Sequence, residues 1–554
     1  MQSTLCVLAL GLGLVGALPC QDLLWRAEGV GGLIGRGADL HRMGDFNNDG
    51  WDDLLELGEV WSTQYQYRIQ TMRVVSGYDG SILSSGQPVP FLWGMGNIAP
   101  LGDMDQDGVL DYGAHIYDGN TPVTTQTLAV FSGATHSILW TATIPNAWGT
   151  GFAGVLTGEL DVNGDGRNDV VTSAYNLSIG GTIIVYDNSG VELYRIIDPV
   201  PGVLAGRDVA TLHGDLDGDG YDDFLASGPD LQNRGAIMCF SGHTGALLRV
   251  SYGEQPGDKL INVGYCGDVD RDGVPDYCGG GSFGYSVVTA FSGATGQVIH
   301  SWRDSTTCCM GISVTGGYDL DQDGVPDLAA GSLNTYMNAY SGRDGTFLGR
   351  WGNTSGLSFS CNGECVAMLA PPPGEQYPII VFTERCWSSY ANNCTYNAVC
   401  PGVVFAYRGC PPGVRAFGLP DHTTGQPLAR SGMRALTVGT TPTVRFSMSE
   451  APAGAAALLM LGNSNAAVGG IALPFGLDAY GFPGITLWTS ADVTLLAYAG
   501  ASGMGSGYAA FDIPLPTGHS ISTTGTPFFA QWLWLDLNNL ANHGSTAGQR
   551  FKLQ

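Results

Sequence analysis

One short acidic phrase recurs six times along this chain, at intervals of 51 to 58 residues. The copies begin at Asp45, Asp103, Asp161, Asp215, Asp268 and Asp319, and each follows the pattern Asp-x-Asx-x-Asp-Gly-x-x-Asp. A fixed spacing of several tens of residues is typical of propellers and solenoids, in which each repeat forms one structural unit. The repeats therefore constrain the fold more than any other feature of the sequence.

The chemistry of the repeated phrase is that of a calcium-binding loop. Oxygen atoms at positions 1, 3 and 5 of a tightly curled loop converge on one point, the Gly at position 6 permits the turn, and the position-7 carbonyl and position-9 Asp complete the shell. Oxygen-only ligands favour Ca²⁺ over zinc or copper. We therefore predict up to six Ca²⁺ ions. Their predicted ligands are Asp45, Asn47, Asp49, Trp51 and Asp53; Asp103, Asp105, Asp107, Val109 and Asp111; Asp161, Asn163, Asp165, Arg167 and Asp169; Asp215, Asp217, Asp219, Tyr221 and Asp223; Asp268, Asp270, Asp272, Val274 and Asp276; and Asp319, Asp321, Asp323, Val325 and Asp327.

Two other interpretations of these loops exist. A turn rich in Asp, Asn and Gly can form without binding anything, and one of the six loops could be empty. The third loop is the candidate exception, because Leu160 precedes it where four of the other loops have Gly. An EF-hand would need an acidic residue at position 12, and only the first loop has one, Glu56. Six loops in register favour calcium sites that are not EF-hands.

Between the loops the sequence predicts short strands. Each loop is followed by an apolar run and, about 20 to 25 residues later in most repeats, by a strand that ends in Ser-Gly, as at Ser241-Gly242. Strands bounded by Gly turns indicate hairpins, and four strands per repeat make one blade. A seventh unit, residues 350–410, has Pro371–Gln376 in place of the acidic loop, so we expect it to be metal-free. Residues 22–40 can add a strand to it and close the ring.

This pattern resembles the FG-GAP, or VCBS-type, repeats of the integrin α-chain N-terminal propeller and its secreted bacterial relatives. The resemblance covers residues 24–410 and rests on the acidic loops, whereas the Phe-Gly and Gly-Ala-Pro signatures are reduced to forms such as Trp93-Gly94 and Ser227–Pro229. It implies an all-β, seven-bladed β-propeller that is stabilised by calcium and used for recognition. It also implies metal loops on one face and ligand contacts on the other. Since only the loops are retained, the metal is carried over and the partner is not.

We divide the chain into three parts. Residues 1–17 are predicted to be a signal peptide, because Leu5–Leu18 is apolar but short and Val15–Ala17 fits a cleavage site; a lipoprotein signal that uses Cys20 is the alternative. Residues 18–410 form the propeller. Residues 411–554 contain no acidic loop and alternate apolar runs with Pro and Gly turns, which predicts a small C-terminal β-sandwich. No later apolar run reaches the length of a transmembrane segment.

Charge argues against nucleic acid as a partner. The formal net charge is −27, and lysine occurs only at Lys259 and Lys552, so no basic stripe could contact phosphates. Much of the acidity lies in the six loops, which fits a protein that holds cations. Few charged residues outside the loops and 84 glycines are expected of tightly turned β-structure.

Cysteine usage agrees with export. Of the 13 cysteines, Cys6 lies in the predicted signal peptide, and the other 12 fall between Cys20 and Cys410. An even number in an oxidising compartment suggests disulfides. Cys266 and Cys278 flank the fifth loop, so we predict that they pair. Metal binding by cysteine is the competing interpretation, and the other connectivities stay open.

Catalytic patterns are weak. Gly280–Gly284 matches the Gly-x-Ser-x-Gly elbow of serine hydrolases, but a strand is expected there rather than the required helix. We favour a secreted or cell-surface calcium-binding recognition or adhesion protein that binds an extracellular protein or glycan and is not an enzyme. The alternative location is the periplasm. The alternative function is an extracellular carbohydrate-active enzyme resembling polysaccharide lyases, which would need Tyr, His, Lys or Arg side chains gathered together.

Overall fold

The structure is a computed structural model of the chain. In the repeat region it describes residues 23–28, 34–62, 67–86, 98–116, 125–145, 155–174, 181–281, 286–304, 310–332, 336–352, 361–373, 377–385 and 403–408. In the C-terminal region it describes residues 415–417, 421–422, 430–438, 441–449, 451–463, 465, 467–468, 471–473, 475–476, 486–487, 489, 493–499, 508–515, 521–522, 526–537, 543–546 and 548–553. The predicted signal peptide, Cys20 and residues 374–376 of the seventh-blade loop lie outside these ranges.

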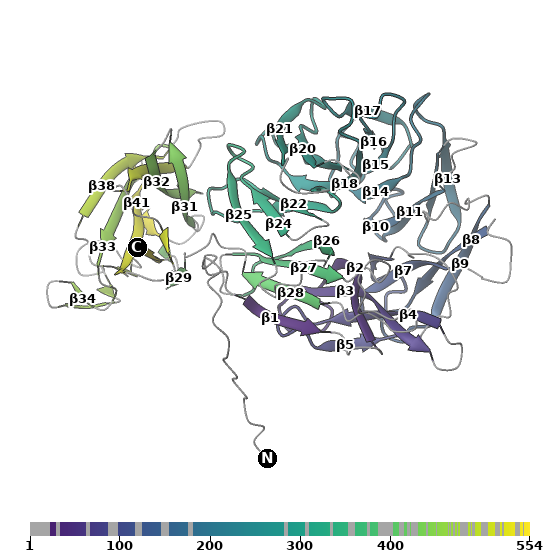
Figure 1. The fold of residues 1–554 in the computed structure, drawn as a ribbon, viewed down its shortest axis with the longest axis horizontal. Coiled ribbons are helices and arrows are strands. Elements are labelled where there is room, and N and C mark those ends of the chain that lie inside the picture. The colour runs from purple at the N-terminus through teal and green to yellow at the C-terminus, as the bar shows by residue number, and fades with distance from the viewer. Residues whose placement is uncertain are drawn as a thin grey trace, which may run out of the picture.

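Seven four-stranded antiparallel sheets are arranged as the blades of a propeller (Figure 1). The first three contain β2 (Ile34–Gly44), β3 (Asp53–Ser62), β4 (Tyr67–Val75) and β5 (Ile82–Ser85); β6 (Ile98–Gly102), β7 (Asp111–Ile116), β8 (Thr125–Phe131) and β9 (Ile138–Pro145); and β10 (Leu156–Leu160), β11 (Asp169–Ala174), β12 (Thr182–Tyr186) and β13 (Glu192–Ile197). The next three contain β14 (Asp208–Thr211), β15 (Phe224–Gly228), β16 (Ala236–Phe240) and β17 (Leu247–Tyr252); β18 (Leu260–Gly267), β19 (Asp276–Gly281), β20 (Val287–Phe291) and β21 (Val298–Arg303); and β22 (Val314–Tyr318), β23 (Asp327–Gly331), β24 (Tyr336–Tyr340) and β25 (Phe347–Gly352). The prediction of a seven-bladed, all-β propeller is confirmed.

The seventh blade combines both ends of the repeat region. It contains β26 (Cys361–Leu369), β27 (Ile379–Arg385), β28 (Val403–Arg408) and, as its fourth strand, β1 (Leu23–Glu28). β1 runs antiparallel to β28, from Leu23 opposite Tyr407 to Glu28 opposite Val403. The prediction that an N-terminal strand closes the ring is therefore confirmed, and closure removes the exposed sheet edge that an open arc would leave.

The core lies between neighbouring blades. Middle strands such as β15 and β16 are buried along their whole length, whereas outer strands such as β13 alternate exposed and half-buried residues. One apolar cluster joins Val171 and Val185 of the third blade to Phe224 and Phe240 of the fourth. Another joins blades one and seven around Trp25. Each blade is thus stabilised by apolar contact with both neighbours, and the acidic loops lie at the strand ends.

The C-terminal region forms a β-sandwich. A larger sheet runs β29 (Arg415–Phe417), β43 (Gly548–Leu553), β41 (Thr526–Leu535), β33 (Ala456–Gly462) and β38 (Val493–Tyr498), and a smaller sheet runs β31 (Arg430–Val438), β32 (Thr441–Ser449) and β39 (Ala509–Pro514). Short strands add to these or pair with one another: β30 (Asp421–His422), β34 (Ala467–Val468), β35 (Ile471–Ala472), β36 (Phe475–Gly476), β37 (Thr486–Leu487), β40 (Ile521–Ser522) and β42 (His543–Ser545). One core contains Phe446 and Met448 of the smaller sheet and Trp532 and Trp534 of the larger, so the apolar run in β41 is core.

The predicted disulfide between Cys266 and Cys278 is wrong in this structure. Both residues are buried free thiols, and they lie close enough for a hydrogen bond between their side chains. The strand register explains why they do not face each other directly. Cys278 is opposite Gly264, and a bulge between Tyr265 and Gly267 displaces Cys266 from the ladder.

Among the residues that the structure describes, none forms an apolar helix of the length needed to span a membrane.

Candidate metal-binding loops

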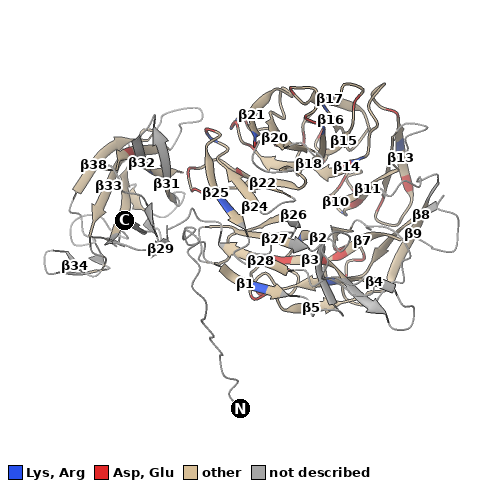
Figure 2. Ribbon diagram, viewed as in Figure 1, with Lys and Arg blue, Asp and Glu red and all other residues tan. Residues whose placement is uncertain are grey.

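All six acidic loops occupy the same place in the fold. Each joins the first strand of a blade to the second; the fourth loop, for example, lies between β14 and β15. Figure 2 marks the acidic residues in red along the described ribbon, where blue Lys and Arg segments are few. The fold therefore places six similar acidic groups around one ring.

Two residues in each loop have left-handed backbone conformations. The position-6 Gly has φ between 79° and 91° in every loop, as predicted from the sharp turn. The position-4 residue is also left-handed, with φ of 59° at Asn48 and 63° at Gln106. This second turn was not predicted, although Asn or Gly at position 4 of three loops is a local signal for it. Together the two residues curl the loop.

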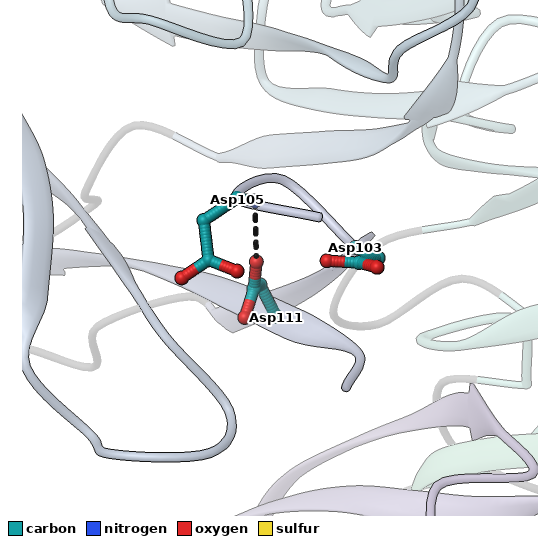
Figure 3. A group of neighbouring side chains, drawn as sticks. All are labelled: Asp103, Asp105 and Asp111. Atoms are coloured by element: carbon teal, nitrogen blue, oxygen red, sulfur yellow. Dashed lines mark hydrogen bonds between the residues drawn. The ribbon is translucent and has the colours of Figure 1, made fainter. Parts of the chain in front are cut away.

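Three carboxylates of the curled loop converge on one another. In four loops the side chains at positions 1, 3 and 9 each offer an oxygen atom, and these atoms lie within 4.8 Å of one another. The four groups are Asp103, Asp105 and Asp111; Asp215, Asp217 and Asp223; Asp268, Asp270 and Asp276; and Asp319, Asp321 and Asp327. Figure 3 shows the second loop, in which the N–H of Asp105 also donates to Asp111. Loops one and three have Asn at position 3, which offers an amide oxygen in place of a carboxylate.

The position-5 Asp is not part of these groups. In the second loop Asp107 Oδ1 accepts the N–H of Val109 at 2.9 Å, and the same bond from position 7 to position 5 occurs in all six loops. In five loops the position-1 Asp accepts the N–H groups of positions 5 and 6, at 3.1 and 2.9 Å for Asp103; in the third loop Asp161 accepts those of positions 4 and 6. The predicted roles of positions 5 and 7 as ligands therefore stay predictions.

In five of the six loops the position-9 Asp accepts the N–H of the Gly in the Ser-Gly turn and so ties the loop to the rest of its blade. It is fully buried in every loop. In the fourth loop, Asp223 accepts the N–H of Leu216 within the loop at 2.6 Å and the N–H of Gly242 in the Ser-Gly turn at 2.9 Å. A Cβ atom on Gly242 would lie 1.9 Å from the carbonyl oxygen of Asp222. Only Gly allows this approach. The Ser-Gly turn and the acidic loop of such a blade therefore pack together as one hydrogen-bonded unit.

Burial makes the position-9 carboxyl groups hard to ionise. Loss of water raises their pKa values, neighbouring loop carboxylates raise them further, and the backbone N–H bonds oppose the shift. The pKa reaches about 6 for Asp53, Asp111 and Asp223 and about 7 for Asp169 and Asp276, and it is also raised for Asp327. A bound cation would reverse this effect by pairing with the charged form.

Neighbouring loops also contact one another around the ring. The position-8 residue of one loop packs on the residue that precedes the loop of the previous blade, as Pro275 does on Gly214 and Asn168 does on Gly102. At the third loop, where Leu160 replaces Gly, Asp222 of the next blade instead accepts the N–H of Asp161 at 3.3 Å. This contact gives a packing reason for the Gly before most loops, so Leu160 alone does not mark the third loop as empty.

The residues fit a divalent cation that prefers oxygen. Each group is made of carboxylates on a curled loop, and the most deeply buried carboxyl has a raised pKa because its acidic neighbours add to the cost of burial. The donor set contains no sulfur or imidazole nitrogen, which excludes the sites typical of zinc. The loops are therefore compatible with divalent cation binding.

Comparison with known proteins points in the same direction. No family model matches the chain. Mouse (Mus musculus) integrin alpha-3 is 28% identical over 199 residues, which cover 30% of this chain and 18% of the integrin. Integrin alpha-6 of Gallus gallus is 27% identical over 154 residues, covering 25% and 14% of the two chains. Integrin alpha-5 of Xenopus laevis is 22% identical over 305 residues, covering 51% and 23%. The repeats are integrin α-like.

The extent of this likeness is limited. Each match spans less than a quarter of the integrin chain, so the activities of whole integrins are not transferred with the repeats. Among solved structures, Sqt1 of Saccharomyces cerevisiae is similar over 70% of this chain and 99% of its own, with 12% identity and a TM-score of 0.42. The resemblance predicted from the acidic loops is confirmed by the integrins, and the blades themselves define the fold.

Proposed function

We propose that the protein is an exported calcium-binding recognition or adhesion protein whose propeller binds an extracellular protein or glycan. The observation that carries this proposal is the sixfold recurrence of one acidic loop geometry on integrin α-like repeats. Calcium neutralises the buried carboxylates and fixes the rim of the ring. The partner is then recognised by a rigid surface, which loses little conformational entropy on binding.

The metal is tested first. Isothermal titration of chelator-treated protein with Ca²⁺ should show several sites, and extracellular-type sites have Kd values on the order of 10⁻⁴ to 10⁻³ M. Mg²⁺ is the control ion, because it demands octahedral geometry and sheds its water reluctantly. No heat of binding and no change in melting temperature with Ca²⁺ would contradict the proposal.

The partner is tested with the calcium-loaded protein on arrays of extracellular proteins and glycans. We expect binding in Ca²⁺ and loss of binding after the metal is removed, because the rim of the propeller loosens. Binding that is identical in excess chelator would show that the loops have no part in recognition. Turnover of a bound glycan would instead support the second candidate function, an enzyme of the polysaccharide-lyase type.

One observation favours that second candidate, an enzyme of the polysaccharide-lyase type. The inner strands bring together side chains from several blades: the rings of His213 and Tyr265 lie 5.3 Å apart, and Arg42 interacts electrostatically with His213 and Tyr318. Such residues could serve as proton donors or acceptors. Burial raises the pKa of Tyr265 and Tyr318, however, which disfavours the phenolate that a base requires. Recognition therefore remains the favoured function.

A screen of uronic-acid polysaccharides for unsaturated products separates the two candidates. If the protein is a lyase, Tyr318→Phe should lower kcat strongly, whereas Tyr78→Phe, at an exposed tyrosine away from this group, should not. The absence of unsaturated products from every polysaccharide tested would remove this candidate.

A further inference from the structure

The sixth acidic loop differs from the others in its surroundings. Asp321 and Asp323 are each 1% exposed and Gln322 is completely buried, whereas Asp217 and Asp219, at the same positions of the fourth loop, are exposed. The two loops have the same sequence pattern and the same arrangement of carboxylates. Their difference in burial therefore comes from what lies against the loop.

The C-terminal β-sandwich lies against the sixth loop. Ser449, the last residue of β32, donates from its hydroxyl to the carbonyl oxygen of Gln322 at 3.2 Å. A Cβ atom added to Gly324 would lie 2.7 Å from the Cβ of Ser449. The same addition at Gly220 in the fourth loop would meet nothing within 4 Å. The sandwich thus packs closely against Gln322 and Gly324 of the sixth loop.

Arg343 joins the loop to the sandwich. Its Nε lies 3.1 Å from Asp323 Oδ2, and its terminal nitrogen donates to the carbonyl oxygen of Asp323 at 2.6 Å. Its guanidinium group also lies 3.8 Å from the ring centre of Tyr508 in the sandwich. Arg343 therefore compensates one loop carboxylate and makes a cation–π contact across the interface.

A second arginine crosses the interface in the opposite direction. Arg445 of β32 lies 3.1 Å from Asp344 in the turn after β24, and it also pairs with Asp512 of β39 at 2.7 Å. The interface is thus built around charged groups at the sixth loop. This is the place where the chain also concentrates Asp319, Asp321 and Asp327.

We propose that the sixth loop is the docking surface of the C-terminal β-sandwich, and that calcium binding at this loop and docking strengthen one another. The inference rests on the calcium binding proposed above. Docking removes water from the carboxylates of Asp321 and Asp323, whose counterparts in the fourth loop are exposed. Arg343 pairs with Asp323, and a cation held by Asp319, Asp321 and Asp327 would offset the cost of burying Asp321, so it lowers the cost of docking. By linkage, docking must then raise the affinity of this loop for calcium by the same factor.

The first test measures that linkage loop by loop. Hydrogen exchange of residues 319–327 and 215–223 is followed during a Ca²⁺ titration of the full chain. Arg445→Ala should raise the calcium midpoint of residues 319–327 about fivefold or more, in the range usual for coupled sites, and leave that of residues 215–223 unchanged. Arg195→Ala is the matched control, because it breaks a surface ion pair with Glu192 inside the third blade.

The second test uses a matched pair of glycines. Gly324→Ala and Gly220→Ala both place a side chain at a left-handed φ, 85° and 91°, so they strain their loops similarly. Only Gly324→Ala also meets Ser449. Small-angle scattering in saturating Ca²⁺ should show a larger radius of gyration for Gly324→Ala than for Gly220→Ala, since only the first separates the sandwich from the propeller.

The outcomes are distinguishable. Calcium protection at residues 215–223 with an unshifted midpoint at residues 319–327 in Arg445→Ala would overturn the coupling alone. Equal radii of gyration for the two glycine variants would overturn the docking surface. The absence of calcium protection at every loop would overturn the proposed calcium binding and the coupling with it.

Discussion

The first six blades and the seventh blade join their first two strands with loops of different chemistry. In the six, an acidic loop joins the first two strands; in the seventh, residues 370–378 with three consecutive prolines join β26 to β27. The resulting four-stranded sheets have the same strand order apart from the origin of the fourth strand. An acidic loop is therefore not needed to connect the strands. Its buried charge is a cost that calls for a cation.

The seventh blade gains its stability by other means. β1 joins the two ends of the repeat region, and Trp25 of that strand donates from Nε1 to the carbonyl oxygen of Gly77 in the first blade at 2.7 Å. The seventh-blade loop also packs Pro373 against Gly50 of the first acidic loop. The comparison suggests that cations stabilise the six blades and that the added N-terminal strand, β1, stabilises the seventh.

Removal of calcium tests this comparison with the largest expected effect. At ten times its Kd, one bound ion contributes about 1.4 kcal/mol, so six ions contribute about 8 kcal/mol. We expect excess EDTA to lower the melting temperature strongly and to raise hydrogen exchange in the acidic loops more than in β26 and β27. Unchanged melting after exhaustive metal removal would contradict the role assigned to the loops.

The next effect is a pH dependence of the calcium-free protein. The position-9 carboxyl groups have pKa values of about 6 to 7 when folded, above the ordinary value of 3.8. The folded state therefore binds these protons more tightly, and the stability they contribute is lost as pH rises through 6 to 7. In EDTA the melting temperature should fall between pH 5 and pH 8. Saturating Ca²⁺ should reduce this fall, and a rise in melting temperature over the same interval in EDTA would refute the explanation.

Trp25→Ala should weaken the seventh blade without involving calcium. Trp25 is 7% exposed and packs against Gly80, and loss of a buried large aromatic side chain costs about 3–5 kcal/mol. Denaturant unfolding should show this loss equally in Ca²⁺ and in EDTA. A loss that appears only in Ca²⁺ would mean that closure and metal binding are not separate.

Sequence reasoning recovered the architecture because repeats, Gly turns and acidic loops are local signals. The seven blades and the closing strand follow from patterns within one repeat or one run. The sequence did not show which distant residues these loops and strands contact. Gly242 lies 19 residues from Asp223, Pro275 packs on Gly214 of another blade, and Ser449 lies 127 residues from Gln322. The strand register that places Cys278 opposite Gly264, and not opposite Cys266, likewise could not be predicted from spacing alone.

Asp223→Ala examines the bond that joins loop to turn. The change leaves the N–H groups of Leu216 and Gly242 without their acceptor in a buried place, and each such group costs about 1–3 kcal/mol. We expect a loss of about 2–4 kcal/mol in Ca²⁺, measured by denaturant unfolding. A loss within error of zero would show that neither the bonds nor the metal at this loop stabilises the blade.

Asp219→Ala should have the smallest effect, because this position-5 side chain is exposed and accepts the N–H of Tyr221 at 3.0 Å. We expect a loss of about 1 kcal/mol, near the usual value of one hydrogen bond, and a somewhat weaker calcium affinity at this loop. Since the resemblance to integrin α repeats implies ligand contacts on the face opposite the loops, binding of the partner should survive at temperatures where the variant is folded. A folded Asp219→Ala protein that no longer binds its partner would place the metal rim itself in the recognition surface, and the six acidic blades would then differ from the seventh in function as well as in stability.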